Sequence, residues 1–432
     1  MTGWFVKAVD YIERSASSTV AELDIFAADD SGWGQGEKLR EIPERLRGSS
    51  GALVGLVSTN SITQGEQVGI LWGWMLAQGI KIHFAHRTFQ WTNDAPGVAA
   101  VHCVIIGFGK SEPGVRRLFD YGRDLRNEPT EIRVGNINPY LLNAPDVVAE
   151  ARRSPISGAP EMSFGNMPND KGGLILSPEE LSELQRTEPS FAARFVRKFW
   201  GAEEFLNGQE RFCLWLVDAT PENLAASSFV QERLAVVRKH RSGSDRAATN
   251  ALAARPHLFG EIRQRDGAFI AVPGVSSERR RFVPIGFLDE SVVVSNLMFF
   301  IPGANEYHFG VLSSTMHNAW VRIVAGRLKS DIRYSPGIVY NNFVWPGDAE
   351  LESEIAAAAQ TILETRSNHA GRTLAQLYSP ETLPHDLSEA HRALDLLVDA
   401  AYGYSGDGED AGRAELLFKL LTDARHREVR KL

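Results

Sequence analysis

Cysteine is nearly absent from this 432-residue sequence, which contains only Cys103 and Cys213. Because the two residues lie far apart, each within an apolar run, neither a disulfide framework nor a zinc cluster is indicated. No apolar run approaches the roughly 20 residues that a helix needs to cross a bilayer. The N-terminus also lacks the basic start, apolar core and small-residue cleavage site of a secretion signal. We therefore expect a cytoplasmic protein that does not insert into a membrane.

Positive charge is not in excess over the whole chain, since the formal net charge at pH 7 is -8. The charge is nevertheless unevenly distributed. Residues 233–281 contain eleven Arg or Lys and four Asp or Glu, a net of +7, whereas residues 347–432 sum to about -7. Two interpretations of the basic segment stay open: a solvated surface of mixed charge, or a strip that faces nucleic-acid phosphates.

Several motifs of catalytic sites are also absent. The sequence has no serine nucleophile elbow, no Walker loop, no helical His-Glu-x-x-His pair and no evident carboxylate-lysine cluster of a nuclease. The side chains of His83, His86 and His102 could serve as bases or metal ligands. However, His83 and His102 lie in strand-like apolar runs without an acidic or cysteine pair at ligand spacing. Histidines hydrogen-bonded in the core or at a domain edge are therefore the favoured interpretation.

The first part of the chain has the pattern of an α/β domain. Residues 52–58 predict a strand, the run GEQVGILWGWMLAQG predicts a helix ending at Gly79, and IKIHFAHRTF and VAAVHCVIIGF predict two further strands. These elements form a partial Rossmann-like sheet, which we assign to residues 1–135. Because a doubly wound domain normally has five to seven strands, we expect only the rear half of the domain here.

The rest of the chain predicts two further domains. Residues 136–346 show short strands punctuated by Gly and Pro, a helix that begins at a Ser177–Glu180 capping box, and basic helical stretches near 229–254 and 313–329. This pattern indicates an α+β domain. Residues 347–432 carry apolar residues three and four apart, which predicts a small all-α domain with a loop over residues 402–410.

Nine runs of the sequence together resemble a known family. They closely resemble the MmeI-like (type IIL) restriction-modification enzymes, which are adenine-N6 DNA methyltransferases. The resemblance covers nearly the whole chain and is carried by STNSITQGEQV (58–68), IHFAHRTFQW (82–91), AAVHCVIIGF (99–108), INPYLLNAPDV (137–147), LFGEIRQ (258–264), VSSERRRFVPIGF (275–287), YHFGVLSS (307–314), GRLKSDIRYS (326–335) and YNNFVWP (340–346).

The resemblance implies S-adenosyl-L-methionine as cofactor and double-stranded DNA as partner. Enzymes of this family join a nuclease domain, a helical spacer, a methyltransferase domain, a target-recognition domain and a helical C-terminal domain. This chain departs from them because it lacks an Asn-Pro-Pro-aromatic loop: Asn138-Pro139-Tyr140 has one proline and follows the sheet. The glycine cluster SGWGQGE follows a polar stretch and is a weak cofactor fingerprint. We therefore expect the S-adenosylmethionine site in a second polypeptide that carries the first half of the domain.

The resemblance also assigns roles to particular residues. In GRLKSDIRYS, Lys329 and Asp331 are expected to read one base pair, because lysine can donate to guanine O6 and N7 while aspartate accepts from the paired cytosine N4 amine. The alternative is a surface charge pair. Phe89 and Trp91 resemble the aromatic motif beside an extruded adenine, with core packing as the alternative.

Six basic residues of the recognition-like domain are candidate contacts to DNA phosphates, which position a duplex without reading its sequence. Taken singly, each is equally well explained as a solvated charge. They are Arg238, Lys239, Arg241, Arg279, Arg280 and Arg281.

Three functions are consistent with these observations. The favoured one is the recognition part of an adenine-N6 DNA methyltransferase whose catalytic half comes from another chain. The alternative is a non-catalytic DNA-binding remnant or a stand-alone specificity protein. An unrelated small-molecule enzyme would require a pocket with converging polar groups, which the sequence does not indicate.

Overall fold

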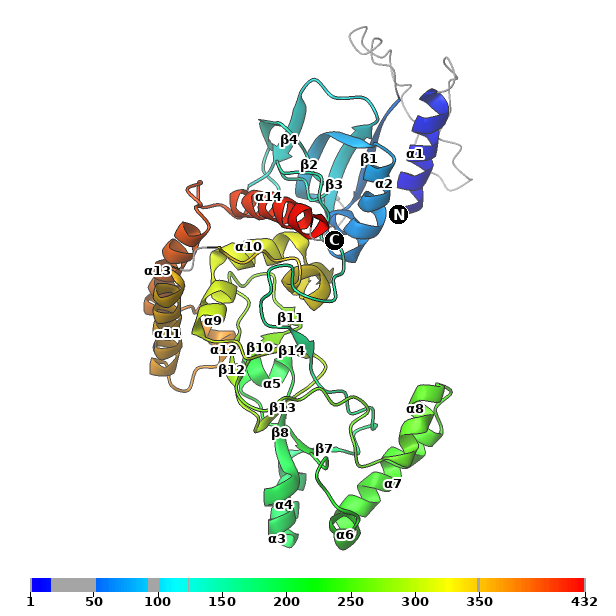
Figure 1. The fold of residues 1–432 in the computed structure, drawn as a ribbon, viewed down its shortest axis with the longest axis vertical. Helices are drawn as coiled ribbons and strands as arrows, with labels where there is room; N and C mark the ends of the chain where they lie inside the picture. The colour runs from blue at the N-terminus through cyan, green and yellow to red at the C-terminus, as the bar shows by residue number, and fades with distance from the viewer. Residues whose placement is uncertain (1, 17–51, 92–100, 123, 348–349, 431–432) are drawn as a thin grey trace, which may run out of the picture. The chain divides into compact units, whose positions relative to one another are not determined.

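The computed structural model describes residues 2–16, 52–91, 101–122, 124–347 and 350–430 (Figure 1). These residues form two compact units, Met1–Glu150 and Ala151–Leu432. The glycine cluster SGWGQGE lies outside the described residues. No described helix combines the length and the apolar character that crossing a membrane requires.

The first unit contains a five-stranded sheet in the order β1-β3-β2-β4-β5. Its strands are β1 (Leu53–Thr59), β2 (Lys81–Trp91), β3 (Val101–Gly109), β4 (Arg116–Asp120) and β5 (Thr130–Val134). Strand β3 lies between β1 and β2 and is antiparallel to both, so β1 and β2 run in the same direction. Their connection contains a 3-10 helix (Asn60–Thr63), a π-helix (Val68–Trp72) and α2 (Gly73–Ala77). The predicted order of strand, helix, strand and strand is confirmed.

An aromatic core joins α1 (Thr2–Ala16) to this sheet. Phe5, on the apolar face of α1, stacks on Phe108 of β3 with ring centroids 5.6 Å apart and meets Trp72 edge-on at 6.0 Å. All three side chains are buried. The indole nitrogen of Trp72 donates to the Ile62 carbonyl oxygen at 3.0 Å, which satisfies its buried N–H group.

Residues after β5 fold back onto the first unit. The Asn136 side chain donates to the Asp146 carboxylate at 2.8 Å, and the Tyr140 hydroxyl accepts from the Ala149 amide at 2.9 Å. Asn138 is fully buried, and its side-chain oxygen accepts from two backbone amides of the same turn. The compact units accordingly divide after Glu150, whereas the sequence suggested a boundary at residue 135.

The second unit begins with short strands in three small sheets. Their orders are β12-β10-β14-β6, β11-β16-β15 and β13-β8-β9-β7. The strands are β6 (Ser163–Phe164), β7 (Ile175–Leu176), β8 (Val196–Trp200), β9 (Phe212–Leu214), β10 (Phe269–Pro273), β11 (Val275–Ser276), β12 (Gly286–Leu288), β13 (Val292–Val294), β14 (Met298–Pro302), β15 (Gly326–Leu328) and β16 (Asp331–Arg333).

Helices connect several of these strands along the chain. The predicted capping box is confirmed, since the Ser177 hydroxyl accepts from the Glu180 amide and the Glu180 carboxylate accepts from the Ser177 amide. The helices are α3 (Pro178–Thr187), α4 (Pro189–Phe195), α5 (Ala202–Asn207), α6 (Pro221–Ala226), α7 (Ser228–Ser242) and α8 (Ala247–Ala251), with a 3-10 helix at Leu252–Ala254. The buried side of α7 packs Val230, Leu234 and Val237 into a core shared with β8 and β9.

The last helices pack directly on the middle of the second unit. They are α9 (Glu306–Ser313), α10 (Thr315–Val324), a π-helix (Pro336–Tyr340), α11 (Glu352–Asn368), α12 (Leu374–Leu377), α13 (His385–Ala401) and α14 (Asp410–Val429). Figure 1 shows α11 and α13 beside α9. A Cβ atom on Gly310 of α9 would lie 2.9 Å from the Ile355 side chain of α11, so only glycine allows this approach. The predicted helical C-terminal region and the loop over residues 402–409 are confirmed.

Candidate nucleic-acid interface

Lys329 and Asp331 lie at the tip of a β-hairpin. Strands β15 and β16 pair Leu328 with Asp331, which leaves Lys329 and Ser330 as a two-residue turn. The Lys329 backbone is left-handed, with φ of 58°, a conformation that residues other than glycine seldom adopt. Lys329 is exposed, and Leu328 beside it is 53% exposed. The tip therefore presents a cation and an anion to solvent rather than to the core.

A second basic segment, about fifty residues earlier in the chain, lies beside this hairpin. Strand β11 pairs with β16, joining Val275 to Arg333 and Ser276 to Ile332. Residues 277–280 then form a turn closed by the Arg280 amide, which donates to the Ser277 carbonyl oxygen at 3.2 Å. Arg281 follows directly, and we call residues 277–281 the arginine turn, which consequently lies beside the hairpin that carries Lys329 and Asp331.

The three consecutive arginines have different surroundings. Arg279 is exposed and forms an ion pair with Glu381. Arg281 is exposed, and its guanidinium approaches the Thr315 hydroxyl at 3.4 Å. Arg280 is half-buried, and burial lowers the pKa of its guanidinium, whereas the nearby Asp331 carboxylate raises it. The side chains of Arg279 and Arg281 are thus the more accessible ones.

Arg238 and Lys239 lie near the end of α7, and both are exposed. Lys239 is in the last turn, where the helix dipole favours positive charge. The exposure of both side chains is compatible with the phosphate contacts expected of them.

Arg241 corrects a prediction, because it has no donor left for a phosphate. Its side chain is 0% exposed. Nε donates to Asn169 O, Nη1 to Leu252 O and Arg255 O, and Nη2 to Pro168 O and Leu258 O, at distances from 2.8 to 3.2 Å. All five N–H groups of the guanidinium therefore bind carbonyl oxygens of two loops.

The loop that Arg241 holds also carries an exposed cation, Lys171. Asn169 and Lys171 have left-handed backbones, with φ of 48° and 55°, and Lys171 is exposed. Such conformations persist only when neighbouring contacts enforce them, which Arg241 does here. The basic run in the sequence gave no signal for Lys171, since this residue lies outside that run. Arg333, two residues after Asp331 on β16, is exposed as well.

Phe89 and Trp91 belong to an aromatic row formed by β2 and β4. The Phe89 ring stacks on Tyr121 with centroids 5.2 Å apart, and Trp91 is 51% exposed. His86 stacks on Phe119 at 4.2 Å, and its Nδ1 lies 2.9 Å from the Tyr121 hydroxyl oxygen. Burial, followed by the positive charge of Arg117, lowers the pKa of His86. Phe89 is partly packed, and Trp91 leaves an open aromatic face.

Other polar candidates do not form a catalytic cluster in the part of the chain that the structure describes. No group of three His, Cys, Asp or Glu side chains there could hold a metal ion. His83 is half-buried in β2, and its pKa is lowered mainly by burial. Cys103 and Cys213 are free thiols in buried positions.

Strand β1 is the described strand that could lead into a cofactor-binding turn. Strand β1 leads into a 3-10 helix of sequence NSIT, so the glycine-rich turn between strand and helix that a nucleotide-type cofactor needs is not found there. We therefore assign no step of catalysis to these residues.

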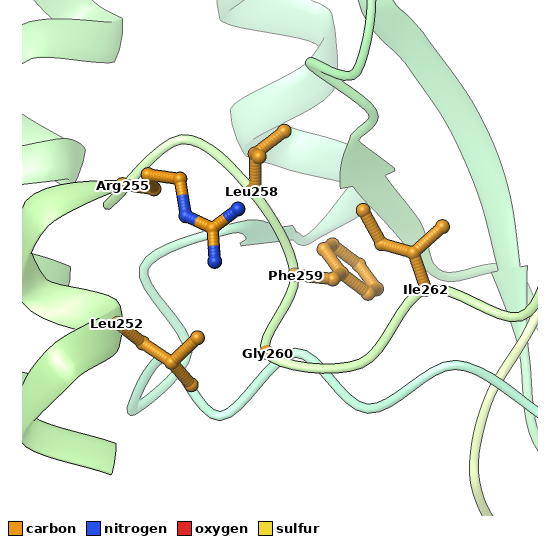
Figure 2. A pocket seen from close by; sticks show the side chains of 6 residues that line it. All are labelled: Leu252, Arg255, Leu258, Phe259, Gly260 and Ile262. Atoms are coloured by element: carbon orange, nitrogen blue, oxygen red, sulfur yellow. The ribbon is translucent and has the colours of Figure 1, made fainter. Parts of the chain in front are cut away.

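Two pockets flank the end of the basic helical segment. One of about 190 Å³ is lined by Leu252, Arg255, Leu258, Phe259, Gly260 and Ile262. Figure 2 shows the Arg255 guanidinium between the side chains of Leu252 and Leu258. The other, of about 420 Å³, has Arg238 and His257 among its mainly apolar lining residues. Neither lining brings together an acid and a base, as a small-molecule catalytic site would require.

Comparison with known proteins identifies the segments of this chain. Family models match at residues 143–347 (MmeI, target recognition domain), 44–120 (MmeI, DNA-methyltransferase domain) and 348–427 (MmeI, C-terminal domain). The Bacillus subtilis (strain 168) protein DNA methyltransferase A is 40% identical over 380 residues, which are 88% of this chain and 42% of that protein.

A solved structure agrees with these matches. The Type IIL restriction-modification enzyme MmeI, solved in complex with DNA, is 44% identical, with a TM-score of 0.77 over 87% of this chain and 50% of that one. The chain thus spans about half the length of these relatives. It belongs to the family of MmeI-like restriction-modification DNA methyltransferases, and corresponds to their target recognition domain, their C-terminal domain and a stretch of their methyltransferase domain.

Proposed function

We propose that this chain recognises the target sequence for a site-specific adenine-N6 DNA methyltransferase of a restriction-modification system. The observation that carries the proposal is the hairpin tip, where the exposed Lys329 and the half-exposed Asp331 lie beside the arginine turn. This hairpin belongs to the segment that matches a target recognition domain. The similar MmeI structure contains DNA, which supports duplex DNA as the partner of this chain.

Lys329 and Asp331 together read one G·C pair in this proposal. The lysine ammonium donates to guanine O6 or N7, and the aspartate accepts from the N4 amine of the paired cytosine. Guanine is therefore preferred on the strand that Lys329 contacts. Exchanging the pair, with Lys329→Glu and Asp331→Arg, reverses the donor and the acceptor and should reverse the preference. An unchanged preference would refute this assignment.

Exposed cations position the duplex by binding its phosphates. Arg238 and Lys239 of α7 and Arg279 and Arg281 of the turn fill this role. Each phosphate that a cation neutralises releases counterions, so the logarithm of the affinity falls by about 0.9 per contact for each tenfold rise in salt concentration.

Phe89 and Trp91 line the pocket of an extruded adenine in this proposal. The exposed Trp91 ring offers a stacking face, and Tyr121 holds the Phe89 ring in place. S-adenosylmethionine supplies the methyl group and binds to residues other than those of this chain, in the same polypeptide or in a second one. Genomic DNA as substrate implies a cytoplasmic location.

Two measurements on the purified chain test this function. We expect salt-sensitive binding of duplex DNA and no heat of binding with S-adenosylmethionine. Methylation of adenine should appear once a polypeptide with the glycine-rich turn and the Asn-Pro-Pro-aromatic loop is added. Tight binding of the cofactor by the chain alone would contradict a cofactor site outside this chain. Sequence-specific binding that never leads to methylation would favour a stand-alone specificity protein.

A further inference from the structure

Arg280 is placed differently from its two arginine neighbours by the backbone. Ser276 pairs with Ile332 at the end of the antiparallel ladder of β11 and β16, so the turn that follows Ser276 begins near Asp331, the residue before Ile332. The hydrogen bond from the Arg280 amide to the Ser277 carbonyl oxygen closes a four-residue turn. That turn returns Arg280 to the edge of the sheet where Asp331 begins β16.

Burial and charge also distinguish Arg280. Arg279 is directed to Glu381 and Arg281 to Thr315, and both are exposed. Arg280 is half-buried, and the Asp331 carboxylate is the charge that opposes the effect of burial on its pKa. A cation in this place attracts the neighbouring carboxylate.

The Asp331 carboxylate has acceptor capacity to spare. Within the described parts of the chain, no side-chain hydrogen bond or ion pair to its oxygens is formed, and Asp331 is only partly buried. An aspartate that reads cytosine must be ionised and must keep an oxygen free for the N4 amine. A cation that attracts the carboxylate without occupying both oxygens leaves one oxygen free for this amine.

We propose that Arg280 is a positioning residue for Asp331, which it orients toward the cytosine amine, and that it is not a phosphate contact. The inference rests on the proposed reading of a G·C pair by Lys329 and Asp331. It assigns adjacent arginines of one turn to different tasks: Arg280 affects which base pair is preferred, and Arg281 affects how tightly any duplex is held.

The test compares Arg280→Gln with Arg281→Gln in the full 432-residue chain. The probes are a duplex of about 30 base pairs enriched from a random pool by the wild-type chain, its single-base-pair variants and an unrelated duplex. A good bidentate base contact is worth roughly 5- to 150-fold in discrimination. We expect Arg280→Gln to lower discrimination at one base pair by at least about threefold, a usual size for coupled neighbours. Its affinity for the unrelated duplex and its salt slope should not change.

Arg281→Gln is the matched control, with the same loss of charge on the same turn. It should weaken binding to every duplex alike and reduce the salt slope by about one. Arg280→Lys, which retains the charge, should keep more of the discrimination between base pairs than Arg280→Gln. It also replaces Arg280→Gln in the test if the glutamine variant does not fold. In an Asp331→Asn background, Arg280→Gln should cause no further loss of discrimination.

Two results would overturn the positioning role. One is a uniform loss of affinity and a lower salt slope in Arg280→Gln, as a phosphate contact would give. The other is unchanged discrimination in Arg280→Gln although Asp331→Asn reduces it. If Asp331→Asn itself has no effect, the proposed base reading fails, and the role of Arg280 fails with it.

Discussion

Arg241 shows that a cation in a basic segment can serve the fold alone. Its five hydrogen bonds tie the end of α7 to the loops at Pro168 and Leu258. Sequence analysis placed it among phosphate contacts because composition reveals charge and not burial. Its neighbours Arg238 and Lys239, one turn or less away, are exposed. Only the packing of α7 against the two loops separates these cases.

Replacing Arg241 should therefore lower the stability of the folded protein. Arg241→Leu leaves several buried carbonyl groups without a donor, and each costs roughly 1–3 kcal/mol when unsatisfied. We expect the free energy of unfolding, measured in urea, to fall by at least about 3 kcal/mol. Arg238→Leu, an exposed control on the same helix, should stay within about 0.5 kcal/mol of wild type. Normal stability with weakened DNA binding in Arg241→Leu would instead support a phosphate contact.

His317 gives the stability of the second unit a dependence on pH. Its ring is 2% exposed in α10, its Nε2 lies 3.1 Å from the Tyr334 hydroxyl oxygen, and burial lowers its pKa to about 3. The unfolded chain binds a proton at this histidine below about pH 6.5, whereas the folded chain does so only near pH 3. The stabilisation is therefore complete above pH 6.5 and is lost as the pH falls toward 3.

The contribution of His317 to the change of unfolding free energy with pH can be measured by substitution. It amounts to about 1.4 kcal/mol per pH unit, or about 2 kcal/mol between pH 7 and pH 5. In His317→Gln, the loss of unfolding free energy between these pH values should be smaller than in wild type by about this amount. His385→Gln, at an exposed histidine, should leave the loss unchanged. Equal slopes in wild type and His317→Gln would contradict the prediction.

At the scale of elements, the hairpin β15–β16 combines the proposed base-reading pair with backbone strain. Lys329 occupies a left-handed position, with φ of 58°, that glycine adopts at little cost. Strained positions of this kind cost of order 1 kcal/mol or more and often mark functional sites. Lys329→Gly and Lys329→Ala distinguish the effect of the backbone strain from that of the side chain. Both variants remove the ammonium group, but only the glycine relieves the strain.

We expect Lys329→Gly to be more stable than Lys329→Ala by about 1 kcal/mol in urea unfolding. Both variants should lose the preference for guanine to the same extent, since neither can donate to the base. Gly347→Ala, in open space without a positive φ, is a control for the general effect of exchanging glycine and alanine. Equal stability of the two Lys329 variants would show that the turn carries no strain.

Elements with strong periodicity were predictable, and those without it were not. Strands β1 and β3 are rich in branched apolar side chains, and α3 begins with an explicit capping box. By contrast, β5 has the sequence TEIRV with no buried residue, so no apolar pattern marks it. The pairing of β11 with β16 could not be predicted either, because it joins segments about fifty residues apart through only two residue pairs. The Lys-x-Asp motif and the three arginines were therefore visible in the sequence, whereas their closeness to one another was not.

At the scale of the whole molecule, the C-terminal helices complete the recognition part of the chain. Trp320 of α10 packs on Phe418 of α14 with ring centroids 5.0 Å apart, and Arg322 pairs with Asp410. The approach of α9 to α11 at Gly310 adds a further close contact. The sequence suggested a boundary at residue 346, where mixed periodicity changes to helical periodicity. Such a change does not reveal whether the two regions share a core.

This shared packing predicts which fragments fold. A chain of residues 151–432 corresponds to one compact unit and should unfold in a single cooperative transition in urea while keeping salt-sensitive DNA binding.

A chain of residues 151–346 keeps the hairpin and every proposed phosphate contact, but it exposes the faces of α9 and α10 that α11 and α14 cover. Because Trp320 and Phe309 are almost fully buried, their exposure costs several kcal/mol, a large fraction of the stability of an ordinary domain. The shorter fragment should therefore be rapidly cleaved by protease and bind DNA without sequence preference. A stable 151–346 fragment that discriminates between sites would show that recognition does not depend on the C-terminal helices.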